Sequence, residues 1–173
     1  QLRRPRIVLA GIVGGALGLS GAAYQGLFRN PLADPYLIGV ASGAGLGATI
    51  VLAAGIQAAY LGVSLLPAAA FVGAMAAVTV AYVVARSSEG LPLTTLILAG
   101  VAISFIASAM TTLLMIRAGP DLRPILSWLL GGLISAQWKH SVMVLPYLLP
   151  SALIILTYAR VLNVMQLREE HAK

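Results

Sequence analysis

The chain has no cysteine and little charge, and both shortages limit what it can be. Without cysteine it forms no disulfide and offers no thiolate to a metal. Only 9% of its 173 residues are charged, whereas soluble domains carry roughly 25%. Because 60% of the residues are hydrophobic, a soluble protein of this size would lack the polar residues for its surface. The composition therefore predicts an integral membrane protein.

Charge is also missing from five long apolar segments. These are 7–27, 36–55, 64–85, 93–115 and 141–159. A membrane-spanning helix needs about 20 apolar residues, and each segment meets or approaches that length. Their hydrophobicity does not alternate as it does in the strands of a membrane barrel. The pattern predicts an all-α, polytopic bundle of about five spans, with a shorter re-entrant or interfacial helix at 125–136.

The lack of ionisable side chains within these segments weakens two alternative functions. A secondary carrier usually keeps a carboxylate or histidine at membrane depth. An intramembrane serine protease using Ser20, in the string "GLSG", needs a histidine base on another span. Both histidines, His140 and His171, lie at segment edges instead. We interpret Ser20 as a small packing residue and predict neither a catalytic group nor a metal site.

The net charge of +6 comes from cations that flank the apolar segments. No basic run is interleaved with aromatic residues, so binding of nucleic acid is not expected. One end of the predicted spans collects Arg29, Arg86, Arg160, Arg168 and Lys173, and the other collects Arg3, Arg4, Arg6, Arg117, Arg123 and Lys139. The two counts are nearly equal, so the positive-inside rule sets no orientation.

A polar corner with two prolines, "FRNPLADPYLIGV", separates the first two apolar segments. Proline removes a backbone donor and is tolerated at the first position of a helix, after a capping residue. Asn30-Pro31 and Asp34-Pro35 both fit that pattern. We expect the first span to end near Arg29 and Asp34 to cap the second.

Glycines recur four residues apart in the first two segments. The pairs are Gly11 with Gly15 and Gly14 with Gly18, followed by Gly39, Gly43 and Gly47. Small residues at this spacing let helix backbones approach closely in a membrane. The string "GVASGAGLG" lacks both the spacing and the lysine of a phosphate-binding loop. We expect these glycines to serve helix packing.

Two further patterns each allow two interpretations. Ser104, Ser108 and Thr111 recur at helical spacing, with Gly100 one turn earlier. They form either the wall of a water-filled pathway or a set of interhelical hydrogen bonds, worth about 0.6 kcal/mol each. The tail 162–171, "LNVMQLREEH", is either a short amphipathic helix on a partner protein or a solvated tail.

Several stretches together resemble the FecCD-type permeases, the membrane subunits of bacterial ABC importers for ferric siderophores, haem and vitamin B12. They are "LRRPRIVLAGIVGGALGLSGAAYQGLFRNPLADPYLIGVASGAGLGA", "LTTLILAGVAISFIASAMTTLL", "DLRPILSWLLGGL" and "LNVMQLREEHA". The resemblance covers essentially the whole chain, and "FRNPLADPYLIGV" is its most specific part. Such permeases have about ten spans. The resemblance implies that 1–173 is a fragment holding the second to sixth, with 160–173 beginning a cytoplasmic coupling loop.

The resemblance also implies a function and a set of partners. The chain would be a multi-pass permease subunit of the bacterial plasma membrane, working by alternating access, with no enzyme activity and no cofactor. Its partners would be a second permease copy, a cytoplasmic ABC ATPase dimer, a substrate-binding protein and the lipid bilayer. An iron-siderophore is the preferred substrate, with haem or cobalamin as related chelates. Arg3 and Arg6 would lie outside, and Arg29, Arg86 and Arg160 in the cytoplasm.

Residue roles follow from motif positions in the family. Arg3 and Arg6 would contact acidic residues of the substrate-binding protein, and Arg4 stands where the family has an apolar residue. Leu93 and Thr94 would form the cytoplasmic gate. The translocation pathway would include Gly100, Ser104, Ser108 and Thr111. ATPase coupling would use Leu162, Asn163, Leu167, Glu169 and Glu170. Arg168 replaces a family glycine, which puts a sharp bend at that position in question.

Overall fold

The computed structural model describes residues 3–56, 59–60, 63–87, 93–118, 122–133 and 136–170. Nearly all of these residues are helical, as the sequence predicts. The chain divides into two compact units, 1–34 with 132–173 and 35–131. The two units are described separately below.

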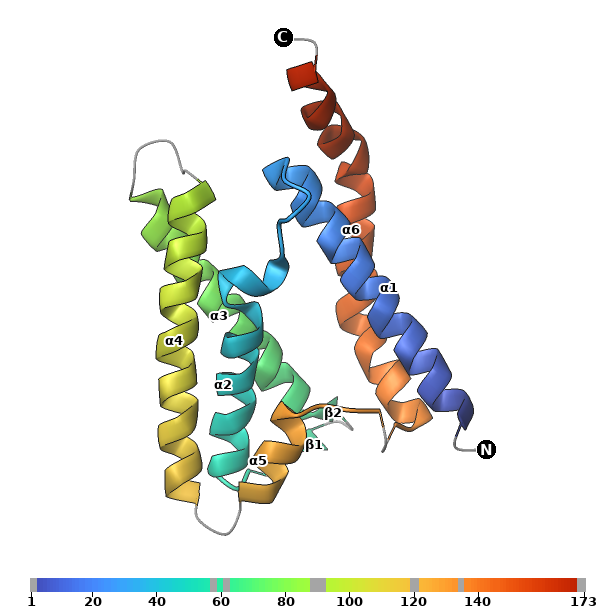
Figure 1. The fold of residues 1–173 in the computed structure, drawn as a ribbon. Coiled ribbons are helices and arrows are strands. Elements are labelled where there is room, and N and C mark those ends of the chain that lie inside the picture. The colour runs from blue at the N-terminus through green and yellow to red at the C-terminus, as the bar shows by residue number, and fades with distance from the viewer. Residues whose placement is uncertain are drawn as a thin grey trace. The chain divides into compact units, whose positions relative to one another are not determined.

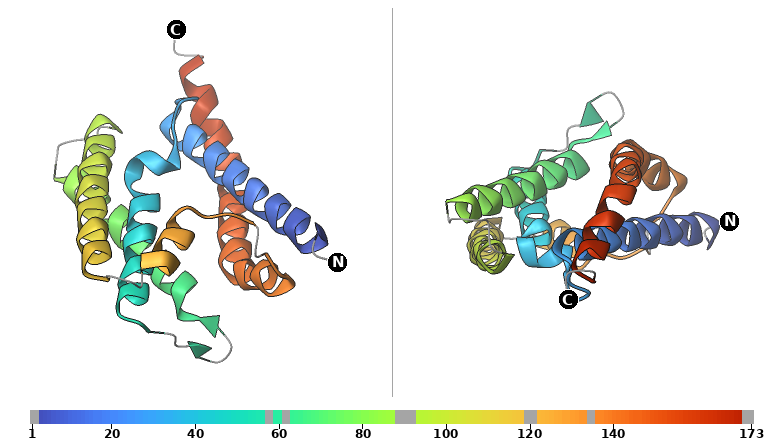
Figure 2. Two further views of the ribbon diagram at one scale, coloured as in Figure 1. Left: turned by 60° about the horizontal axis from the view of Figure 1, so that its bottom comes forward. Right: turned by 90° about the horizontal axis from the view of Figure 1, so that it is seen from above.

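The first unit consists of two long helices that lie side by side (Figures 1 and 2). Helix α1 spans Arg3–Phe28 and helix α6 spans Trp138–Glu170. Both helices begin at the same end of the unit, where the N-terminus lies in Figure 1. This parallel arrangement places Arg4 and Lys139 at one end and Arg29 at the other, in agreement with the grouping expected from the sequence.

Helix α6 is longer than the sequence analysis predicted. Its 33 residues run without a break past the expected end of the fifth span at 159 and through Arg168. Pro146 and Pro150 lie well inside the helix, so their missing N–H groups leave two carbonyls without their helical donors. Residues 160–170, within the segment 160–173 expected to begin a coupling loop, continue this helix.

The second unit packs three helices against one another, with shorter elements at their ends. Helices α2 (Val40–Ala53), α3 (Leu65–Arg86) and α4 (Leu93–Ala118) are in mutual contact. Helix α3 runs antiparallel to the other two (Figure 1). The 3-10 helix η1 (Pro35–Ile38) contacts α4, and α5 (Leu122–Leu129) contacts α2. Strands β1 (Ala59–Tyr60) and β2 (Val63–Ser64) form a minimal antiparallel pair.

Four of the helices in the described residues are long and apolar enough to cross a membrane, one fewer than expected. They are α1, α3, α4 and α6. Helix α2, within the predicted span 36–55, has 14 residues and measures about 21 Å at 1.5 Å per residue. A bilayer core is about 30 Å thick. Helix α5 has eight residues, so the segment predicted at 125–136 is indeed too short to span.

The segment between α1 and α2 shows why α2 starts late. Helix α1 ends at Phe28, as expected, and Arg29 has a left-handed φ of 50°. The Oδ1 atom of Asn30 accepts a hydrogen bond from the Leu32 N–H at 2.9 Å, which is a local turn and not a helix cap. Pro35 then begins η1. Helix α2 starts only after Gly39, whose φ of 87° interrupts the helical path. The prediction that Asp34 caps the second span is therefore wrong, because Gly39 occupies the N-cap.

The interior of the second unit is built from small residues. Ala48, Ala81 and Ala85 have no exposed surface, and Ile125 is the largest fully buried side chain. Gly43 and Gly47 on α2 face Gly73 and its neighbours on α3 so closely that a Cβ at any of the three would collide with backbone of the other helix. The glycine spacing on α2 thus serves helix packing, as the sequence predicts.

Candidate functional site

The polar stripe on α4 lies partly against η1 and α2. Gly100 is buried, and a Cβ there would meet the Leu37 carbonyl and the backbone of Ile38. Thr111 is buried as well, with 8% of its surface exposed. Ser104 is half-buried and Ser108 is exposed. The structure thus brings the four predicted pathway residues onto α4 but leaves only the two serines accessible within this unit.

Two hydroxyl groups of this stripe bond to their own helix. Ser104 Oγ donates to the Gly100 carbonyl, and Thr111 Oγ1 donates to the Ala107 carbonyl, each at 2.8 Å. The backbone carbonyl of Ser108 accepts from Thr112 Oγ1 at 3.0 Å. The bonds of Ser104 and Thr111 satisfy those two hydroxyl donors without a second helix and leave their oxygen lone pairs able to accept from water or a solute.

A cleft of about 230 Å³ opens beside the two accessible serines. Its wall consists of Tyr36, Leu37, Val101, Ser104, Phe105 and Ser108. Tyr36 was missed by the sequence analysis, which treated "DPYLIGV" as the start of a regular span. The 3-10 turn after Pro35 brings this exposed tyrosine to α4. Its position directly after Pro35 was the one sign that it lies outside a regular helix. Which residues of α4 it then meets depends on the tertiary structure and not on the local sequence.

The residues expected to gate the pathway lie at the start of α4. Leu93 is the first residue of that helix and Thr94, the second, is exposed. The side chain of Leu93 and residues 88–92 fall outside the described residues. Arg86 ends α3 and is exposed.

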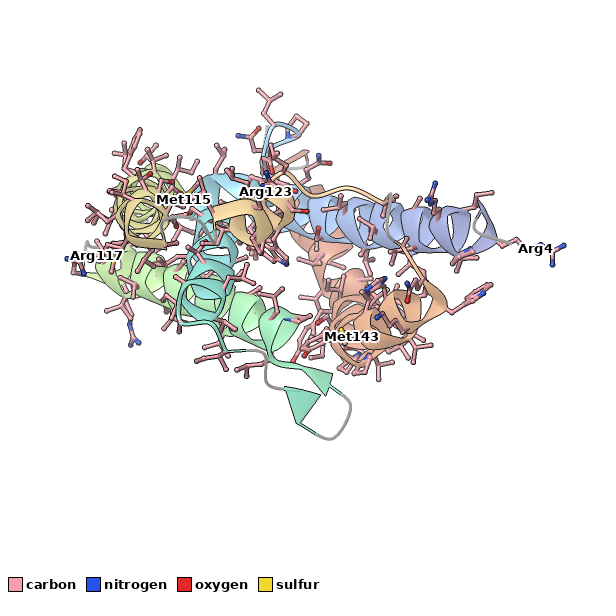
Figure 3. The ribbon with its side chains drawn as sticks, turned by 90° about the horizontal axis from the view of Figure 1, so that it is seen from below. Arg4, Met115, Arg117, Arg123 and Met143 are labelled. Carbon is pink, nitrogen blue, oxygen red and sulfur yellow. The ribbon has the colours of Figure 1, made fainter. Side chains whose placement is uncertain are left out.

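The cations expected to meet a binding protein lie in the first turns of α1. Arg4 is exposed and extends from the end of the helix, as Figure 3 shows. Arg6 is half-buried. Arg3 begins the helix, but its side chain falls outside the described part. Lys139, in the first turn of α6, is exposed at the same end of the unit and was not assigned a role by the sequence analysis.

The residues expected to couple the chain to an ATPase lie on the last turns of α6. Leu162 is half-buried and Asn163 is exposed. Leu167, Glu169 and Glu170 belong to the same continuous helix, although their side chains fall outside the described residues.

The protease alternative finds no support in the geometry. Ser20 Oγ donates to the Leu17 carbonyl at 3.0 Å. The Nδ1 atom of His140 accepts from the Gln137 N–H at 3.0 Å, which ties the imidazole to the start of its own helix. Among the described residues no group of three His, Cys, Asp or Glu side chains gathers to hold a metal.

Comparison with known proteins finds import permeases among the relatives of this chain. The chain is 40% identical over 171 residues to the cobalamin import system permease protein BtuC of Halobacterium salinarum, covering 99% of the chain and 45% of that relative. It is 39% identical over 175 residues to the hemin transport system permease protein HmuU of Yersinia pestis, covering 99% and 52%. The chain therefore spans about half the length of these relatives.

A solved structure also matches. It is described as an inward-facing conformation of a metal-chelate type ABC transporter, and it superposes with a TM-score of 0.81 at 31% identity, covering 99% of this chain and 54% of that one. The family model that matches residues 1–173 is that of the FecCD transport family. With its whole length matched by this model, the chain belongs to the FecCD transport family.

Proposed function

We propose that the chain forms part of the permease subunit of a binding-protein-dependent ABC importer in a bacterial plasma membrane. The observation that carries the proposal is the family match over residues 1–173, together with relatives named as import permeases. Four long apolar helices supply the membrane-crossing framework that such a subunit needs. The chain contributes a conduit, and ATP hydrolysis takes place on partner subunits.

The proposed substrate is a large metal chelate. The names of the relatives refer to cobalamin and hemin, and that of the solved structure to a metal chelate. These names favour a tetrapyrrole over the iron-siderophore that the sequence analysis preferred. A siderophore remains the second candidate, because it is also a bulky chelate of the class that the family's solved structure names.

The proposed pathway wall is the accessible part of the α4 stripe with the neighbouring tyrosine. Ser104 and Ser108 offer hydroxyl oxygens beside Tyr36 in the 230 Å³ cleft. Gly100 and Thr111 belong to the same stripe of α4 and are buried. Such a surface is weakly polar and carries no charge, which suits the passage of a bulky solute that must not be held tightly.

In the proposed mechanism, the ATPase subunits act on the chain through α6. In this proposal an ATPase dimer pushes on Leu162, Asn163, Leu167, Glu169 and Glu170, and the movement opens or closes a gate at Leu93 and Thr94 between two permease copies. The coupling residues belong to the same continuous helix as the last span, because α6 extends from Trp138 to Glu170. The ATPase must contact the two states differently for the conformational equilibrium to shift.

Transport by the complete importer in proteoliposomes tests this function. The full-length permease, its ATPase and its binding protein are reconstituted, and uptake of cobalamin, hemin and a ferric siderophore is compared. We expect uptake of one of these chelates that requires both ATP and the binding protein. Uptake that persists with the ATPase subunits omitted would refute the proposal.

A further inference from the structure

At the end of the first unit where α1 and α6 begin, the charged residues among those described are all cationic. Arg3, Arg4 and Arg6 lie in the first turns of α1, and Lys139 lies in the first turn of α6. Because the two helices are parallel neighbours, all four belong to the same end (Figures 1 and 2). The acidic residues of this unit, Asp34, Glu169 and Glu170, follow α1 or end α6 instead.

This arrangement does not help the helices themselves. The start of a helix carries a partial positive charge, and a cation placed there opposes the helix dipole by about 0.3–1 kcal/mol. Neither α1 nor α6 has an acidic residue in its first turn to compensate. Like charges at one end of a small unit also repel one another. A partner that brings negative charge to this end would relieve both effects.

Two of the cations are available to such a partner. The side chains of Arg4 and Lys139 are exposed, and they come from different helices. Arg4 extends from the end of α1 in Figure 3. A guanidinium binds a carboxylate through a planar fork, and an ammonium binds it as a point charge with three donors. The pair therefore suits separate carboxylates on one acidic surface.

We propose that Lys139, with Arg4, forms a second cationic contact for an acidic face of the substrate-binding protein. This inference rests on the proposed function. It adds α6 to a docking surface for which the family motif supplied only Arg3 and Arg6 of α1. The expected ligands are Asp or Glu side chains of the partner.

The distribution of cations favours a protein partner over anionic lipid. In the orientation that the family resemblance implies, this end faces outward, where the positive-inside rule predicts fewer lysines and arginines than in the cytoplasm. The first unit instead has four at this end and, among the residues that the structure describes, three at the other, namely Arg29, Arg160 and Arg168. The outer end therefore has more cations than the rule predicts, and an acidic protein partner at this end explains the excess.

Binding of the substrate-binding protein to the complete permease–ATPase complex, held in nanodiscs of uncharged phosphatidylcholine, tests the inference. We expect Lys139→Gln to weaken this binding about two- to fivefold, as for one exposed ion pair, and to reduce its dependence on salt. Lys139→Glu should weaken it further, whereas Lys139→Arg should retain the original affinity. Arg160→Gln, at the opposite end of α6, is the matched control and should leave the affinity unchanged.

Other outcomes separate the possible failures. Unchanged affinity in both Lys139→Gln and Lys139→Glu, with wild-type binding intact, would overturn this inference alone. A loss of affinity that appears only in nanodiscs of anionic phosphatidylglycerol would also overturn it, in favour of a lipid headgroup. A wild-type complex that binds no substrate-binding protein at all would overturn the proposed function as well.

Discussion

Helices α1 and α2 carry the same glycine spacing, but the structure uses the two sets differently. On α2, Gly43 and Gly47 lie against α3, and no Cβ fits at either position. On α1, a Cβ at Gly11, Gly14, Gly15, Gly18 or Gly21 would meet no atom within 4 Å. A small-residue repeat therefore shows that two backbones can approach closely, but it does not show whether the partner helix lies within the same 173 residues.

The largest effect is expected where two glycines face each other. A Cβ at Gly73 would collide with the Gly43 carbonyl, which is backbone and cannot rotate away. Gly73→Leu should destabilise the fold by about 3 kcal/mol or more, at the upper end of overpacking effects. Thermal unfolding of the full-length permease in detergent measures this. A melting temperature within a degree or two of the original would mean that α2 and α3 do not pack as described.

A smaller loss is expected at the contact between α4 and η1. A Cβ at Gly100 would meet the Leu37 carbonyl, so Gly100→Ala must displace the 3-10 turn that carries Tyr36. We expect a destabilisation of about 1–3 kcal/mol, accompanied by slower uptake in proteoliposomes. Ala102→Gly, at an exposed position on the same helix, is a control for helix propensity. Equal uptake rates in Gly100→Ala and the original protein would show that the position of this turn does not affect transport.

A still smaller loss is expected at the start of α2. Gly39 has a φ of 87°, which side-chain-bearing residues rarely adopt, and a Cβ there would lie 3.3 Å from the Gly100 carbonyl. Gly39→Ala should cost about 1 kcal/mol of stability. Gly39→Asn should cost less, because asparagine tolerates left-handed φ better than alanine. Chemical unfolding of the two variants side by side checks the order, and a more stable alanine variant would contradict the assigned backbone conformation.

The smallest effect is expected on α1. Gly15→Ala replaces an unpacked helical glycine, and the gain in helix propensity should stabilise the chain by about 0.5–1 kcal/mol or leave it unchanged. The stability of Gly73→Ala is measured under the same conditions. Both variants change helix propensity alike, so the difference between their stabilities reports packing. If Gly15→Ala instead destabilises the full-length permease, then a helix outside these 173 residues, or a second copy, covers this face of α1.

Much of the fold was predictable because it depends on local composition. The absence of charge over stretches of 20 or more residues predicts long apolar helices, and α1, α3, α4 and α6 confirm four of them. The end of α1 at Phe28 followed from the prolines just beyond it. The start of α2 was not predictable in the same way, because hydrophobicity is continuous from Tyr36 to Gly55 and only the backbone of Gly39 interrupts the helix.

The candidate site was only partly predictable. Helical spacing puts Gly100, Ser104, Ser108 and Thr111 on one side of α4, since the helix repeat is a local property. Spacing did not indicate which of them are covered, because burial depends on where η1 and α2 lie. Tyr36 was missed for the same reason, as it acquires its neighbours from a distant segment of the chain, whereas Lys139 was grouped with Arg4 from the sequence but was given no role.

The sequence by itself determined that the chain is helical, apolar and a member of the FecCD transport family, because these depend on residue type, short-range order and shared motifs. The tertiary structure alone decided which glycines are packed and which serines stay accessible. Those properties depend on backbones and side chains far apart in the chain being brought together, and no local pattern specifies which partner each residue receives.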